Sequence, residues 1–355
     1  MIKWSRSIAA LTLFVAICSA FASLNSSHIS RKIITIEGGG DIDRITAAMV
    51  FISVGVWFQL ASALVVGLFK TTYNKASRKI ELKKTTAEHA HMHIYAIASG
   101  AFGIFALLPS LYAYQKYDGS LVVPLSVVLP LLLAVMIDVW PRKRVRFDLI
   151  FLPSIVIMFG AFLTSMRKLD LTDLDGALLA VGLLTTAGLL RAISEHLNQI
   201  GSRPDEKTGL RSEAIGATEF SVWRMFYLTI WGMIVAPFVA IVILQNGHGF
   251  INLWKTAVPL AVPFLIVMQT AGAIENVAKT VAEKKATVSE VVSRVSLASA
   301  LAFGGSLVVD YYYPDSLGPI DKEPLLLVLR GVGVIILVMG VFRLKPALFA
   351  IEEKK

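Results

Sequence analysis

Residues 47–69 read AAMVFISVGVWFQLASALVVGLF, a run without a single charged side chain. About 20 apolar residues span the hydrocarbon core of a bilayer, because each helical residue rises about 1.5 Å across roughly 30 Å. Lipid offers no hydrogen-bond partner to free backbone groups, so this run predicts a membrane-spanning α-helix. A membrane β-barrel would show short segments of alternating polarity instead, and this stretch does not alternate.

Similar apolar blocks recur along the whole chain. The sequence is 55% hydrophobic and only 17% charged, whereas a soluble domain carries about 25% charged residues. We therefore expect an all-α membrane protein with ten transmembrane helices in one membrane domain. The expected spans are residues 7–30, 44–69, 92–115, 119–140, 147–166, 174–197, 219–244, 254–277, 288–311 and 324–343.

The first span has two interpretations. Lys3 and Arg6 precede an apolar core, and residues 20–22 (Ala-Phe-Ala) resemble a signal-peptide cleavage site. The apolar character continues through Leu24, which favours an uncleaved first helix. Cys18 is the only cysteine, so the chain can form no intrachain disulfide.

The chain carries a formal net charge of +9. In a soluble protein this excess would suggest nucleic-acid binding, but here the basic residues gather in short loops, so no nucleic-acid partner is expected. With a cytoplasmic N-terminus, 22 lysines and arginines, Lys279 among them, fall on the cytoplasmic side and seven on the other. The positive-inside rule then predicts a multi-pass protein of the plasma (inner) membrane with both termini cytoplasmic.

Collinear matches relate residues 1–170 to residues 171–355. The matched pairs are Leu24/Leu197, Asn25/Asn198, Val123/Val295, Leu125/Leu297, Leu129/Leu301, Asp138/Asp310, Ile155/Ile335, Gly160/Gly340 and Phe162/Phe342. Five helices in each half place the halves in opposite orientations, so the sequence predicts two inverted five-helix repeats. Many secondary transporters are built this way, with the substrate site between the repeats.

The segments SLYAYQKYDGSLVVPLSVVLPLLLAV (residues 110–135) and IVIMFGAFLTS (155–165), separated by a basic loop, recur in the second half as VSEVVSRVSLASALAFGG and GVGVIILVMGVF. This pattern resembles the drug/metabolite transporter superfamily, specifically its EamA-like two-repeat permeases. The chain departs from that family in carrying Asp138 and Asp310 near the place of a common glutamate. The resemblance implies a ten-helix permease that exports or exchanges a small polar metabolite. It also implies a central cavity lined by the first four helices of each half, with the fifth and tenth helices peripheral.

Polar side chains inside a membrane span are costly, which makes each one a candidate functional residue. Gln269 is the nearest to the membrane midplane, while Arg224 and Tyr227 share a helix face suited to an anionic or aromatic substrate. The expected substrate-binding residues are Asn25, Ser126, Asn198, Arg224, Tyr227 and Gln269. The expected coupling or gate residues are His93, Arg191, Glu195, Glu275 and Arg294.

Several of these candidates have a purely structural alternative. Arg191 and Glu195 have the i, i+4 spacing of an intrahelical ion pair, and the serines around Arg294 indicate close helix packing. His89 and His93 have the spacing of metal ligands on a helix. Their position beside a basic loop favours a solvated helix start, so neither a metal nor another cofactor is expected.

The expected function is secondary transport of a small polar metabolite by alternating access, as efflux or exchange. The sequence has no HExxH, GxSxG or P-loop motif, so we propose no catalytic residues. The alternative is a non-transporting membrane protein, either an intramembrane enzyme or a scaffold or receptor. A scaffold or receptor would fill the central space with apolar side chains. The expected partners are the bilayer and the metabolite, with a homodimer as a further option.

Overall fold

A computed structural model describes residues 2–35, 39–73, 90–116, 131, 147–164, 174–202, 217–283, 288–313 and 323–343. Every regular element in these residues is helical. The expected fourth span, residues 119–140, lies outside the described residues except for Leu131, and so does Ser126.

Most helices lie close to the expected spans, and α12 has the expected bounds. Short π-helical segments, Ile29–Ile33 and Val239–Ile243, extend α1 and α7. The helices are α1 (Ile2–His28), α2 (Asp41–Tyr73), α3 (Ala90–Lys116), α5 (Phe147–Thr164), α6 (Leu174–Ser202), α7 (Ala217–Phe238), α8 (Gly247–Thr256), α9 (Val258–Glu283), α10 (Val288–Val295), α11 (Leu297–Tyr312) and α12 (Pro324–Arg343).

Two of the expected spans, 254–277 and 288–311, are divided. The first is split between the short helix α8 and α9, and the second is interrupted at Ser296 between α10 and α11. The chain turns into α8 because Gln245 adopts a left-handed conformation (φ 53°) and the Asn246 side chain accepts a hydrogen bond from the Gly249 amide at 3.3 Å. This is the bond of a helix N-cap.

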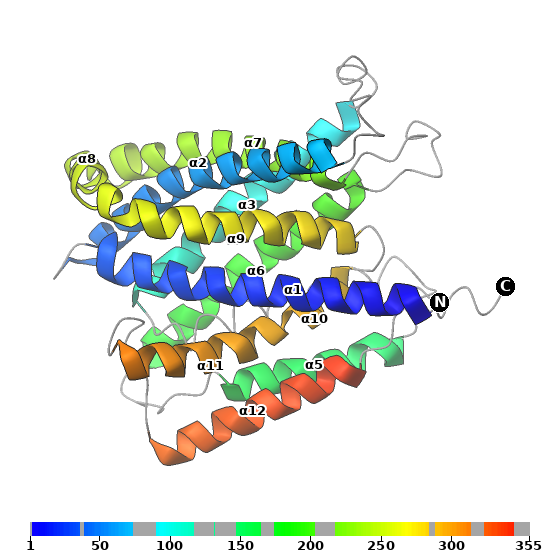
Figure 1. Cartoon of the computed structure of the whole chain (residues 1–355). Coiled ribbons are helices and arrows are strands. Elements are labelled where there is room, and N and C mark those ends of the chain that lie inside the picture. Colours follow the sequence, from blue (N-terminus) through cyan, green and yellow to red (C-terminus); the bar gives the residue numbers. More distant parts are fainter. Residues whose placement is uncertain are drawn as a thin grey trace.

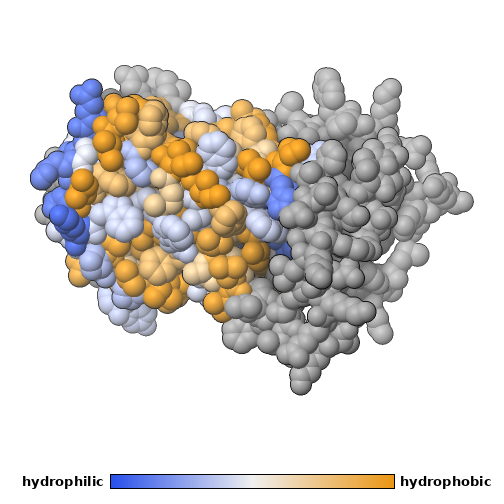
Figure 2. Space-filling view, turned by 90° about the horizontal axis from the view of Figure 1, so that it is seen from above, coloured by the Kyte–Doolittle hydropathy of each residue, from blue (hydrophilic) through white to orange (hydrophobic). Residues whose placement is uncertain are grey.

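Among the described residues, seven segments are long and apolar enough to cross a membrane; they lie in α1, α2, α3, α7, α9, α10–α11 and α12. Large apolar side chains such as Phe162, Ile335 and Phe342 are exposed. In the coloured part of Figure 2, apolar residues cover much of the surface, and hydrophilic residues gather at the end near α8. Exposed apolar surface on this scale marks a contact with membrane or protein. The chain is therefore an all-α, multi-pass membrane protein.

Six long helices surround the centre of the molecule, and α5 and α12 pack against each other at one side (Figure 1). In the central group α3 packs against α6, α1 against α9 and α2 against α7, while α3 also contacts α7 and α2 contacts α9. Exchanging α1, α2, α3 and α5 for α6, α7, α9 and α12 turns each of these pairings into itself or into another observed pairing. The packing is therefore symmetric between the two halves of the described chain.

The crossing of α5 and α12 depends on glycine. A Cβ atom at Gly160 would overlap the backbone nitrogen of Leu337, and a Cβ at Gly340 would lie 2.7 Å from Cγ1 of Ile157. Residues 157 and 160 precede 337 and 340 by the same 180 positions. The two contacts therefore have equivalent positions on the two helices.

Candidate functional site

A cavity of about 210 Å³ lies among the central helices. Its walls come from α1, α2 and α3 in the first half of the chain and from α6, α7 and α9 in the second. Apolar side chains, among them Phe51, Leu111 and Leu228, form part of the lining. The polar lining residues are Ser19, Ser23, Ser26, Gln59, Ser110, Arg191, Ser194, Glu195, Arg224, Gln269, Glu275 and Asn276.

Two ion pairs connect α6 to α9 beside this cavity. Lys279 Nζ lies 2.8 Å from Glu195 Oε1, and both side chains are about 95% buried (5% and 4% exposed). Arg191 Nη2 lies 3.9 Å from Glu275 Oε1, and the Arg191 side chain is 40% exposed. On α6 the cation Arg191 precedes the carboxylate Glu195 by four residues. On α9 the carboxylate Glu275 precedes the cation Lys279 by four residues, so parallel helices place opposite charges beside each other. The pairs thus run between the helices, and the expected Arg191–Glu195 pair is replaced by these two.

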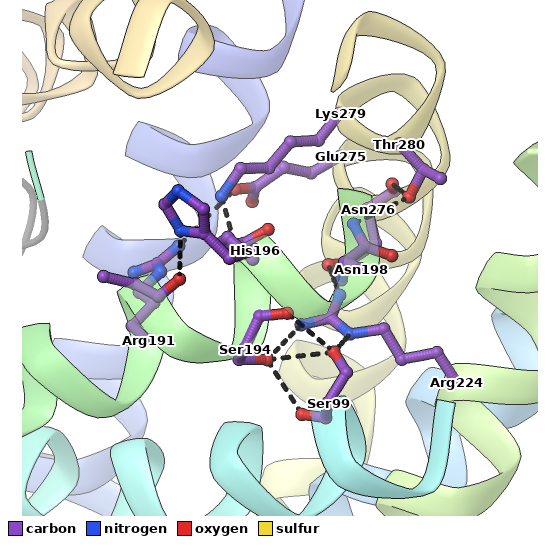
Figure 3. Close-up of polar contacts among 12 residues, drawn as sticks. Ser99, Arg191, Ser194, His196, Asn198, Arg224, Glu275, Asn276, Lys279 and Thr280 are labelled. Atoms are coloured by element: carbon purple, nitrogen blue, oxygen red, sulfur yellow. Dashed lines mark hydrogen bonds and ion pairs between the residues drawn. The ribbon is translucent and has the colours of Figure 1, made fainter. Parts of the chain in front are cut away.

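Arg224 is held by three hydrogen bonds to neutral groups (Figure 3). Its Nε donates to Ser99 Oγ at 2.9 Å, Nη1 to Asn276 Oδ1 at 3.0 Å and Nη2 to Ser194 Oγ at 3.1 Å. The serine hydroxyls donate to each other's backbone carbonyls across α3 and α6, at 2.9 and 2.8 Å. Three helices therefore fix the guanidinium at the cavity wall.

A buried hydrogen-bond network continues from this wall towards the C-terminal ends of α6 and α9. Thr280 Oγ1 donates to the Asn276 carbonyl at 2.8 Å and accepts hydrogen bonds from Asn198 Nδ2 and Ser221 Oγ. Asn198, Ser221 and Thr280 are at most 1% exposed. These three side chains do not line the cavity and form a buried polar contact beyond its wall.

Five of the expected site residues line the cavity: Arg191, Glu195, Arg224, Gln269 and Glu275. These residues lie on α6, α7 and α9 and are up to about 85 positions apart in the sequence. The fold brings them together on the polar lining of the cavity.

The remaining candidates lie elsewhere. Tyr227 contacts His93 at 3.0 Å between hydroxyl and ring nitrogen, in an aromatic cluster with Trp223. Asn25 donates to the Phe21 carbonyl of its own helix, and other α1 residues line the cavity instead. Asn198 belongs to the network just described, Arg294 is buried on α10 away from the lining, and Ser126 lies outside the described residues.

Sequence reasoning missed Ser99, Ser194 and the true place of Lys279. Lys279 was assigned to a cytoplasmic loop, but α9 continues to Glu283 and buries it. Ser99 precedes Gly100, where a Cβ atom would lie 2.9 Å from the Leu228 backbone nitrogen. This close approach of α3 to α7 puts Ser99 beneath Arg224, and the small residues at 99, 100 and 103 were its sequence signal.

The described residues contain no group of three or more His, Cys, Asp or Glu side chains placed to hold a metal ion. Comparison with known proteins adds no identification: no protein-family model matches this chain, and no curated protein matches it. The function is therefore argued from the cavity and its charged lining.

Proposed function

We propose that this protein is a secondary transporter that moves a small polar metabolite across the membrane by alternating access, as efflux or exchange. The observation that carries this proposal is the polar cavity whose walls come from both halves of the chain. Ionisable residues inside a membrane protein usually mark a substrate or ion pathway. A scaffold or receptor is expected to fill this space with apolar side chains, so the charged lining favours transport.

The packing supports a ten-helix arrangement of two inverted five-helix repeats, like that of the EamA-like permeases. On α7, the Thr229 hydroxyl donates to the Val56 carbonyl of α2 at 3.0 Å. These residues are 173 positions apart, the same offset that aligns Asn25 with Asn198. Equivalent segments meet each other where a two-fold axis passes, as the reciprocal contacts of Gly160 with Leu337 and of Gly340 with Ile157 indicate for α5 and α12. An experimental structure whose halves do not superpose after a half-turn in the membrane plane would end this part of the proposal.

The proposed location is the plasma (inner) membrane, with both termini cytoplasmic. The excess of lysine and arginine in the loops on the cytoplasmic side supports this location. The excess remains when Lys279 is counted in α9 and not in a loop. Single cysteines in a Cys18→Ser background test the orientation. Residues 75–84 should be labelled from the cytoplasmic side, and labelling from the outside would reverse the topology.

We assign the coupling role to Glu195, whose carboxylate faces Lys279 and lines the cavity. The other charged groups near this carboxylate are the cations Arg191 and Arg224, which attract it, and the Glu275 carboxylate, which repels it. Protonation of Glu195 would release Lys279 and change the contact between α6 and α9. Such an ion pair can therefore link proton movement to a change in helix packing.

The test is uptake of isotope-labelled polar metabolites into proteoliposomes that contain the purified full-length protein. At least one metabolite should accumulate above protein-free liposomes, and excess unlabelled metabolite should suppress it. Glu195→Gln should fold, as its melting curve would show, and lose the pH dependence of uptake, whereas Asp41→Asn, on an exposed helix end, should keep it. No uptake of any metabolite overturns the transport proposal, and an unchanged pH profile in Glu195→Gln overturns only the coupling role.

A further inference from the structure

Among the residues that the structure describes, the charged groups around the cavity do not balance. Three cations, Arg191, Arg224 and Lys279, face two carboxylates, Glu195 and Glu275. Each carboxylate has a cation other than Arg224 within ion-pair distance, at 2.8 Å for Glu195 and 3.9 Å for Glu275. Among the described residues, no carboxylate lies within ion-pair distance of Arg224. The group therefore carries one excess positive charge, and Arg224 is the cation whose direct partners are all neutral.

The guanidinium of Arg224, a residue that lines the cavity, retains N–H donors that no acceptor in the described part of the chain uses. A guanidinium has five N–H groups, and the three bonds to Ser99, Asn276 and Ser194 use one hydrogen on each nitrogen. One hydrogen remains on each terminal nitrogen. These two remaining N–H groups can donate to the oxygens of a carboxylate or phosphate, the anions that arginine binds with more than one hydrogen bond.

The arginine is also held rigidly in place. It is 6% exposed, and the two serines that accept its hydrogen bonds are themselves fixed by reciprocal bonds to each other's backbone. A buried charge whose partners are all neutral is costly until an opposite charge arrives. A preorganised donor of this kind loses little conformational entropy on binding, so more of the interaction energy appears as affinity.

The other polar lining residues suit the uncharged part of a small ligand. Gln59 and Gln269 supply amide donors and acceptors, and Ser23 and Ser26 supply hydroxyls. Gln269 has room because α2 has a glycine opposite it: a Cβ atom at Gly55 would lie 2.8 Å from Gln269 Nε2. The cavity of about 210 Å³ is smaller than the roughly 300–1,000 Å³ of pockets for drug-sized ligands. The space therefore favours a metabolite of few atoms.

We infer that the substrate is a small soluble organic anion whose carboxylate or phosphate binds the two free N–H groups of Arg224, while its polar remainder faces Gln59 and Gln269. This inference rests on the proposed transport function and names its substrate class. An anionic lipid headgroup shares the same chemistry, so the test must separate the two sources.

The test measures the melting temperature of the purified full-length protein in phosphatidylcholine nanodiscs, because a ligand that binds only the native state raises it. The probes are succinate, glycerol 3-phosphate and inorganic phosphate, with glycerol and succinamide as neutral comparisons and putrescine as a cation. At least one anion should raise the melting temperature, and the neutral and cationic probes should not.

Variants then assign the effect to the guanidinium. Arg224→Gln should weaken the apparent affinity for the active anion by at least about tenfold, since a charge-assisted hydrogen bond is lost. Arg224→Lys keeps the charge but loses the paired donors and should recover only part of the affinity. Arg343→Gln removes one positive charge from the exposed end of α12 and should match the parent.

The outcomes separate this inference from the transport proposal. No stabilisation by any anion, or equal stabilisation of Arg224→Gln, overturns the anion site, even if a neutral metabolite is transported. Replacing part of the phosphatidylcholine with phosphatidylglycerol tests the lipid source. If phosphatidylglycerol alone stabilises the protein through Arg224 and abolishes the effect of the soluble anions, the soluble substrate is overturned. Anion binding without uptake into proteoliposomes supports the anion site and overturns transport.

Discussion

The α5–α12 pair and the α6–α9 pair are held together by different kinds of contact. α5 and α12 are in backbone contact, because glycines at 160, 333 and 340 let the helices approach closely. α6 and α9 are joined mainly by long charged side chains beside a cavity. Helices in backbone contact cannot separate without losing their packing, whereas helices joined through side chains can. If the proposed transport function holds, α5 and α12 should stay together while the contact between α6 and α9 changes.

Removing Lys279 should have the largest effect on stability. Lys279 Nζ lies 2.8 Å from Glu195 Oε1. Lys279→Met replaces this cation with an apolar side chain and leaves the Glu195 carboxylate buried without it. Breaking a buried ion pair by removing one partner costs about 3–5 kcal/mol. The free energy of unfolding in mixed detergent micelles should fall by this amount.

Two further variants show whether the unpaired charge is the cause. The double variant Lys279→Met with Glu195→Gln removes both charges and should recover most of the lost stability. Arg191→Met breaks the longer pair with Glu275, in which the arginine is 40% exposed, and should cost less than about 1 kcal/mol. If Lys279→Met and Arg191→Met cost the same, the distinction between the two ion pairs is wrong.

A glycine on α12 should show the next largest effect. A Cβ atom at Gly333 would lie 2.5 Å from the Thr164 backbone nitrogen and 2.7 Å from the Gly160 carbonyl oxygen. Backbone atoms cannot move aside as a flexible side chain can, so Gly333→Ala should cost about 1–3 kcal/mol in the same unfolding measurement.

The matched control lies two residues away on the same helix. A Cβ at Gly331 would have nothing within 4 Å, and alanine is the better helix former by about 1 kcal/mol. Gly331→Ala should therefore leave stability unchanged or raise it slightly. Equal destabilisation by both alanines would mean that the α5–α12 contact does not depend on close backbone approach.

Helix positions could be predicted from the sequence wherever apolar length alone decides them. α12 begins at Pro324 and ends at Arg343, as expected, because its ends coincide with a proline and a charge. The turn into the short helix α8 could not be predicted, because it depends on distant contacts. Asn246 Nδ2 donates to Asp43 Oδ1 and Thr46 Oγ1, both at 3.1 Å, and these residues lie about 200 positions earlier in the chain.

The site could be predicted only in part for a related reason. Glu195, Arg224 and Gln269 were identified because a polar residue in an apolar span is conspicuous in the sequence itself. The partners of these residues depend on the register between neighbouring helices. The sequence of α6 alone predicts an Arg191–Glu195 pair, but α9 offers each of them a partner of opposite charge. The sequence of either helix alone does not predict how α6 and α9 align with each other.

The smallest of the three effects should come from Ser99, which anchors Arg224 without carrying charge. Ser99→Ala removes the acceptor of the Nε hydrogen bond and the hydroxyl that donates to the Ser194 carbonyl. We expect a loss of about 1 kcal/mol in the free energy of unfolding. We also expect weaker anion stabilisation than in the parent, since the guanidinium loses one of its three fixed contacts, but a smaller loss than in Arg224→Gln.

Ser110→Ala is the control for this last variant, because Ser110 also lies on α3 and lines the cavity but bonds only to the Ala106 carbonyl of its own helix. It should change both quantities by less than about 0.5 kcal/mol. If Ser99 merely joined α3 to α6, Ser99→Ala would lower the melting temperature without changing the anion concentration needed for half-maximal stabilisation. If Ser99 positions Arg224, that concentration must rise, and the rise should disappear when Ser99→Ala is introduced into Arg224→Gln, where no guanidinium remains to be positioned.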